Sequence, residues 1–164
     1  MSTPIPILLY HSVSDRPDPR DRRWTVGVAD FAAHARAVAA SGRIAMTVTE
    51  IAEALRGGRP LPERPVGITF DDGFSDTYEA VVALEARGLV STVYVTSGEV
   101  GRSDRLTPAQ LSEVAHGTSV ELGAHAVRHR RLDELDGRGL TAEVEGSRVE
   151  LEELVQAPVR SFAY

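Results

Sequence analysis

Short apolar runs alternate with amphipathic segments along the whole chain of 164 residues. β-branched and aromatic residues are common in the apolar runs, as is typical of strands, and the runs lie at residues 5–11, 43–48, 65–70, 89–96, 119–125 and 159–164. Between them, apolar residues recur at helical spacing, at residues 30–42, 47–58, 76–88, 107–117 and 141–156. The pattern therefore predicts about six strands in alternation with helices.

Capping residues mark several of the predicted helix boundaries. Thr47 with Glu50, and Thr107 with Gln110, have the spacing of a capping box, in which each side chain accepts from the other residue's backbone N–H. Asp30 is the expected N-cap of the first helix. These local signals support the helices independently of the apolar pattern.

Strands that alternate with helices are typically parallel, with each helix crossing one face of the sheet. The sequence therefore predicts an α/β protein with a parallel sheet or barrel, in one domain over residues 1–164, since domains run roughly 100–200 residues. Five or six strand–helix units are too few for a complete eight-unit (β/α) barrel. The last predicted strand reaches the final residue, which predicts an unpaired, apolar sheet edge.

Composition limits the partners and the chemistry available to the chain. The net charge of −6 argues against a nucleic-acid partner, because phosphate binding needs a basic surface. There is no cysteine, so a metal would have to be bound by His, Asp or Glu. Residues 1–12 have no basic segment and only a short apolar run, so neither a secretion signal nor a membrane span is predicted. A cytoplasmic location is expected unless a leader was removed.

Acidic and imidazole side chains directly follow two of the predicted strands. Asp71 and Asp72 follow the third strand, His125 ends the fifth, and His129 comes four residues later. Reactive groups gather at the carboxyl ends of parallel strands, so a divalent-metal site with one carboxylate and two imidazoles is expected. Because consecutive strand side chains point to opposite sides, one aspartate can bind the metal while the other takes a proton from bound water. Such a site would hydrolyse an amide or an ester.

Each of these motifs alone is weak evidence for a metal site. An Asp-Asp-Gly sequence is often a solvated turn, and a pair of histidines spaced four residues apart often lies on a surface. Two such motifs, each directly after a strand, are much less expected from unrelated turns. Together they favour the metal site.

The same motifs resemble those of a known family. The segment VGITFDDGFSDTYEAVVALEARGLVSTVYVTS, followed by VELGAHAVRHRRLDEL, is similar to the polysaccharide deacetylase family, the NodB-like carbohydrate esterases of family 4. The opening ILLYHSV resembles the subgroup with the poly-N-acetylglucosamine de-N-acetylases, and the final RSFAY resembles the start of its third motif. The resemblance runs from about residue 5 to the last residue. It implies a distorted (β/α) barrel.

The resemblance implies a role for each residue of the proposed site. Asp71 resembles the catalytic base, which takes a proton from a metal-bound water. Asp72, His125 and His129 resemble the metal ligands. Zinc is the first expectation for the ion, with cobalt and nickel as alternatives.

Two further residues are implied to line the site. Tyr164 lies where a backbone N–H holds the oxyanion of the tetrahedral intermediate. His11 either lines the active cleft or is a structural histidine. The implied reaction is the removal of an N-acetyl or O-acetyl group from a sugar, in a glycan that contains N-acetylglucosamine.

The chain departs from the family pattern in two places. Ala126 stands where the family has Ser or Thr, so a hydroxyl that braces the loop is lost. The family's fourth and fifth motifs, which supply a partner for the base, an apolar wall and a general acid, have no counterpart up to residue 164. The chain is therefore expected to be a fragment, to be completed by a partner chain or a second copy, or to be an inactive truncated form.

Three functions therefore stay open at this point. The first is a metal-dependent carbohydrate deacetylase, the second is a deacylase of the same fold that acts on a small amide or imide, and the third is a non-catalytic metal-binding subunit. Outside the motifs, Trp24 is expected to be packed. The acidic residues of the last helix, Glu143 among them, are expected on its solvent-exposed face.

Overall fold

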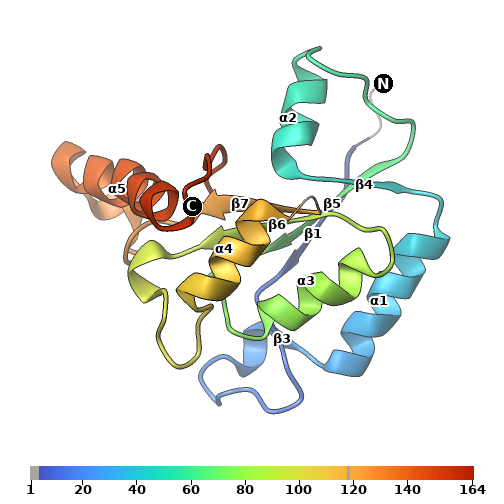
Figure 1. Ribbon diagram of the computed structural model, residues 1–164, viewed down its shortest axis with the longest axis horizontal. Helices are drawn as coiled ribbons and strands as arrows, with labels where there is room; N and C mark the ends of the chain where they lie inside the picture. The colour runs from blue at the N-terminus through green and yellow to red at the C-terminus, as the bar shows by residue number, and fades with distance from the viewer. Residues whose placement is uncertain (1–3, 118) are drawn as a thin grey trace.

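The computed structural model describes residues 4–117 and 119–164 and contains one five-stranded parallel sheet (Figure 1). The strand order is β1-β5-β6-β7, and β4 also pairs with β5. The strands of this sheet are β1 (Ile7–Tyr10), β4 (Ile44–Met46), β5 (Pro65–Phe70), β6 (Ser91–Val95) and β7 (Val120–Ala124). A separate two-stranded parallel sheet is formed by β2 (Ser12–Val13) and β3 (Thr25–Val26).

Five α-helices within the described residues connect or flank these strands. They are α1 (Val28–Ala40), α2 (Val48–Leu55), α3 (Thr77–Glu85), α4 (Pro108–His116) and α5 (Gly137–Val155). The predicted fold class is confirmed, because the chain forms a mixed α/β structure with parallel strands and an incomplete barrel. None of the described helices combines the length and the apolar character that crossing a membrane requires.

The sixth predicted strand, residues 159–164, is the main difference from the predicted strand pattern. It is limited to one parallel bridge between Phe162 and Ala124. Two backbone hydrogen bonds hold it beside β7, from Ala124 N to Ser161 O (2.9 Å) and from Ala163 N to Ala124 O (3.0 Å). The pairing does not extend back to residue 159, whose N–H donates to the side chain of Glu152 instead.

Helix boundaries follow the predicted caps in α2 and α4, where both capping boxes are present. The predicted N-cap of α1 is wrong. The N-cap residue is Gly27, and Asp30 lies inside the first turn. The first free N–H of α1, that of Val28, donates to the carboxylate of Asp15 (3.0 Å), so a residue in the preceding loop supplies the acceptor that Asp30 was expected to provide.

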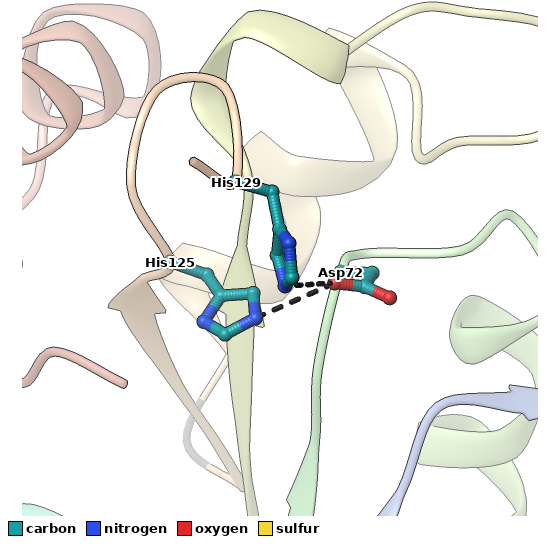
Figure 2. Close-up of side chains that lie close together, drawn as sticks. All are labelled: Asp72, His125 and His129. Atoms are coloured by element: carbon teal, nitrogen blue, oxygen red, sulfur yellow. Dashed lines mark ion pairs between the residues drawn. The ribbon is translucent and has the colours of Figure 1, made fainter. Parts of the chain in front are cut away.

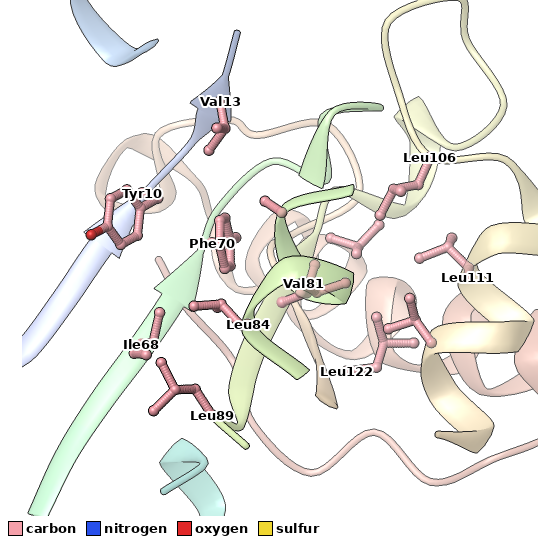
Figure 3. Packing of buried hydrophobic residues seen from close by; sticks show 14 of the residues in the cluster. Tyr10, Val13, Ile68, Phe70, Val81, Leu84, Leu89, Leu106, Leu111 and Leu122 are labelled. Atoms are coloured by element: carbon pink, nitrogen blue, oxygen red, sulfur yellow. The ribbon is translucent and has the colours of Figure 1, made fainter. Parts of the chain in front are cut away.

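Strand side chains separate into an outer apolar face and an inner face with a polar group at its centre. Ile68 and Phe70 on β5 are buried in the main core with Leu84 of α3 and Leu111 of α4 (Figure 3). Each such side chain contributes roughly 1.5–3 kcal/mol by leaving water, which fixes the helices on this face. On the inner face, the Glu121 carboxylate accepts hydrogen bonds from side-chain hydroxyls, those of Thr49, Thr92 and Ser161.

Gly123 on β7 lets the C-terminal segment lie directly against the sheet. A Cβ at this position would lie 2.5 Å from Cε1 of Tyr94 and 2.8 Å from Oγ of Ser161. Both separations are too short for real atoms, so any larger residue would push the segment containing Ser161 away from β7. The close approach matters because this segment contacts the candidate site.

The inner face of the barrel is open along β1. Ile7 and Leu9 are 52% and 56% exposed, although they lie on a strand. Ile7 lies over Gly67 on the inner face, with Cγ1 3.2 Å from where a Cβ of that glycine would be. The described residues therefore leave apolar surface uncovered at the β1 edge.

Candidate metal site and catalytic carboxylate

Two loops at the carboxyl ends of parallel strands contain the predicted site residues. Asp71 and Asp72 directly follow β5, and His125 directly follows β7, with His129 in the same loop. Because β6 lies between β5 and β7 and is parallel to both, the two loops emerge at the same edge of the sheet. Figure 2 shows Asp72, His125 and His129 pointing toward one another.

The two aspartates lie in a turn and not on the strand. β5 ends at Phe70, and Asp72 and Gly73 have left-handed φ values of 70° and 67°. Aspartate adopts this region more readily than most residues, whereas a Cβ on Gly73 would lie 3.3 Å from both methyl groups of Val95. We expected strand alternation to point the two carboxylates to opposite sides. That reason is wrong, because both residues follow the strand and the backbone turns between them.

Asp72, His125 and His129 have a geometry that fits one small divalent ion. Asp72 Oδ1 lies 3.4 Å from Nε2 of His125 and 3.5 Å from Nε2 of His129, and one ligand atom from each residue lies within 4.8 Å of the others. Zinc binds such atoms at about 2.0–2.2 Å in a tetrahedron, which places ligand atoms roughly 3.3–3.6 Å apart. The donor set of two nitrogens and one oxygen also suits zinc.

The C-terminal segment sets the orientation of the His125 ring. His125 is 4% exposed, and its Nδ1 lies 3.0 Å from the backbone oxygen of Ala163. A carbonyl can only accept a hydrogen bond, so Nδ1 carries the proton and donates it, which leaves Nε2 directed at Asp72. In metal sites, a carbonyl that accepts the other N–H of a ligand histidine fixes the orientation of the ring and makes the ligand nitrogen more basic. Sequence reasoning predicted a strand here and missed the role of this carbonyl.

The opposite side of the triad is accessible. The His129 side chain is 61% exposed, and a small hollow of about 40 Å³ lies beside the imidazoles, lined in part by His125, His129 and Tyr164. Tyr164 thus lies next to the candidate ligands, with its side chain in solvent. Its assignment to the oxyanion stays a prediction.

Asp71 is a half-buried carboxyl next to the triad. Burial raises the pKa of Asp71 above its ordinary value of 3.8, although the positive charges of His125 and His11 partly offset this effect. The backbone N–H of Asp71 donates to Tyr10 O on β1 (3.0 Å) and fixes the residue at the end of the sheet. A carboxylate with a raised pKa holds a proton more strongly, which suits a general base.

His11 and Trp24 form a stacked pair at the edge of this site. Their ring centres lie 5.1 Å apart with an interplanar angle of 27°, and the guanidinium of Arg23 lies 4.6 Å from the Trp24 ring centre. His11 is near enough for its charge to lower the pKa of both Asp71 and Asp72. Trp24 is 47% exposed and does not belong to the core, which corrects the expectation that it is packed.

Glu143 is the second functional candidate that sequence reasoning missed. It was expected in solvent, but it is only 5% exposed and accepts hydrogen bonds from the loop that contains both histidines. The helical period could have revealed it, because residues 143, 147, 151 and 155 are spaced by four and form the buried face of α5.

Without a metal, Asp72 and His125 stabilise each other's charged forms. Burial by itself lowers the pKa of His125, but the hydrogen bond to Asp72 and the charge of Asp71 outweigh it and raise the pKa above 6.5. Burial by itself raises the pKa of Asp72, but its hydrogen bond to His125 and the charge of that ring reverse the effect, so the pKa is lowered. Both shifts favour the charged forms of His125 and Asp72, with the second imidazole proton on the nitrogen that an ion would need.

Zinc affinity is therefore expected to rise with pH. Below the raised pKa of His125, each ion must displace one proton from Nε2, so the affinity should increase by about tenfold per pH unit through this group. Above that pKa the contribution disappears and the curve flattens. Competition with a chromophoric chelator from about pH 5.5 to 8 measures the slope. A constant affinity over this range would contradict the raised pKa of His125.

Comparisons with known proteins show which chains this one is similar to. A family model described as polysaccharide deacetylase matches residues 58–164. The chain is 32% identical over 146 residues to YxkH of Bacillus subtilis (strain 168), whose name also contains the words polysaccharide deacetylase. That match covers 88% of this chain and 50% of YxkH, so the chain spans about half the length of this relative.

A second relative and a solved structure extend the comparison. The poly-beta-1,6-N-acetyl-D-glucosamine N-deacetylase of Escherichia coli (strain K12) is 32% identical in an alignment of 96 positions that covers 49% of this chain and 14% of that protein. The Streptococcus pyogenes deacetylase PplD, solved in complex with acetate, superposes with a TM-score of 0.86 at 24% identity. This superposition covers 98% of this chain and 73% of PplD, and at that identity it establishes the fold alone.

Proposed function

The chain belongs to the polysaccharide deacetylase family, and on this basis we propose that it is a metal-dependent hydrolase that removes acetyl groups from a carbohydrate. The observation that carries the proposal is the convergence of Asp72, His125 and His129 beside the half-buried Asp71. The proposed substrate is a glycan that contains N-acetylglucosamine, because the Escherichia coli relative is named for action on such a polymer.

Each residue of the site has its own task in this proposal. Asp72 would bind the ion through Oδ1, and His125 and His129 would bind it through Nε2. When present, zinc would polarise the acetyl carbonyl and lower the pKa of a water molecule from ~16 toward ~7. Asp71 would take the proton of the attacking water, because its raised pKa makes it the more basic of the two carboxylates. The N–H of Tyr164 would donate to the developing oxyanion.

The open β1 edge supports a second part of the proposal. We propose that residues 1–164 form one deacetylase domain and that additional polypeptide, from a partner chain or a second copy, covers the exposed Ile7 and Leu9. Large apolar surface at a sheet edge is otherwise a site of aggregation. A stable, monodisperse solution of single 164-residue chains, measured by light scattering, would contradict this part.

The activity is tested by measuring acetate release from N-acetylglucosamine oligomers by the zinc-loaded protein. Release should stop when a chelator removes the ion and return when zinc is added back, because the residues alone supply no strong electrophile. Small N-acyl compounds serve as the comparison substrates. Faster turnover of the small N-acyl compounds would identify a small amide, and not a glycan, as the substrate. Zinc binding without turnover of either class would indicate a non-catalytic metal-binding protein.

A further inference from the structure

The side chain of Glu143 contacts the loop that contains both candidate imidazoles. Glu143 lies on α5, and its Oε2 accepts hydrogen bonds from the N–H groups of Val127 (2.9 Å) and Arg128 (2.8 Å). These two residues lie between His125 and His129 in the sequence. A single carboxylate oxygen therefore binds the middle of the loop from a different secondary-structure element.

This loop has a backbone that needs outside support. Ala126 and His129 have left-handed φ values of 60° and 51°. Neither residue is a glycine, and such conformations persist only where the surroundings hold them. Ala126 also has no hydroxyl with which to brace the loop from inside. The fixed placement of His129 must therefore come from contacts made by other parts of the chain.

Two elements hold the loop, one through its carbonyls and one through its amides. The segment after β6 donates two backbone hydrogen bonds, from Ser97 N to Ala126 O (3.1 Å) and from Gly98 N to Val127 O (2.9 Å). Glu143 of α5 accepts hydrogen bonds from two N–H groups of the loop. The middle of the loop therefore cannot rotate without breaking hydrogen bonds to both elements.

The burial of Glu143 indicates that these hydrogen bonds are strong. A carboxylate that is 95% buried is costly unless it is paired or hydrogen-bonded, and amide hydrogen bonds to an ionised oxygen are stronger than those between neutral groups. The helix is in turn fixed by the core residues Leu151 and Val155. Gly146 on the same helix lies against Val127, with a Cβ position 3.4 Å from Cγ2. Glu143 is therefore a rigid support and not a mobile surface side chain.

We infer that Glu143 is a positioning residue for the metal site, and this inference rests on the metal binding proposed above. By holding the N–H groups of Val127 and Arg128, it keeps His129 at the separation from His125 and Asp72 that one ion requires. It acts through the backbone and does not contact the ion. Glu143 thus braces the loop in place of the hydroxyl that Ala126 lacks.

The test compares the zinc affinities of three variants with that of the 164-residue protein, by chelator competition at one pH. Glu143→Ala removes both hydrogen bonds and should weaken zinc binding by about 10- to 100-fold, as is found for groups that hold metal ligands in place. Glu143→Gln keeps an oxygen that can accept both N–H groups and should bind within about threefold of the wild type. Glu145→Ala, at an exposed position on the same helix, is the matched control and should not change the affinity.

Several results would overturn the inference. Wild-type zinc affinity in folded Glu143→Ala, or an equal loss in Glu143→Gln, would show that the two hydrogen bonds do not position the ligands. If the alanine variant does not fold, Glu143→Asp shortens the reach by one methylene and gives the same comparison, with weakened binding expected and unchanged binding contradicting the inference. Absence of zinc binding by the wild type would instead overturn the proposed function itself, so the two failures are distinguishable.

Discussion

Replacement of Asp71 by asparagine is expected to reduce acetate release by about 10²- to 10⁴-fold, the usual contribution of a general base. Asparagine has nearly the same shape but cannot take a proton from water. Asp71 is not one of the three groups that converge on the ion position, so the variant should keep zinc affinity within about threefold. The measurements are acetate release at saturating zinc and chelator competition on the same sample.

The pKa of Asp71 also predicts the direction of the stability change. Since burial raises this pKa, the carboxyl binds protons more tightly in the folded than in the unfolded protein, and its contribution to stability is lost as pH rises through the folded pKa. At neutral pH the charged form is therefore a cost, and Asp71→Asn should melt at or above the wild-type temperature.

Asp30→Asn, an exposed site on α1, is the control for activity. Full activity in Asp71→Asn would remove Asp71 from the mechanism.

Replacement of His129 by alanine is expected to lower zinc affinity by at least about 100-fold, since loss of a group that merely supports a ligand already costs about 10- to 100-fold. Acetate release at limiting zinc should fall in parallel. The side chain is 61% exposed, and its interaction with Asp72 spans 3.5 Å, so the metal-free protein should melt close to the wild-type temperature. Zinc content after dialysis and thermal unfolding with and without zinc measure the two effects.

His116 provides the matched control for this variant. It is an exposed histidine on α4 whose Nδ1 lies 2.8 Å from Ser112 O, and it is not part of the triad. His116→Ala should therefore retain full zinc binding and activity. Equal zinc content in His129→Ala and His116→Ala would mean that the three converging residues do not hold the ion.

Elements that depend only on residues near one another in the sequence could be predicted from the sequence. The strand at β5 has its predicted bounds, and the capping boxes of α2 and α4 form as expected, because each depends on residues within one turn or one strand. Where the deciding partner lies outside the element itself, the prediction is wrong. Asp15 caps α1 across thirteen residues, and Glu152 takes the N–H of residue 159 away from a sixth strand.

The sequence by itself determined the parallel α/β class and the placement of Asp71, Asp72, His125 and His129 after strands, because strand periodicity and chain order are local properties. Only the tertiary structure decided how these groups are held. The Ala163 carbonyl that orients His125 and the Glu143 carboxylate beneath the histidine loop are far from their partners in the chain. A hydrogen bond across such a distance depends on the packing of whole elements, which no short stretch of sequence specifies.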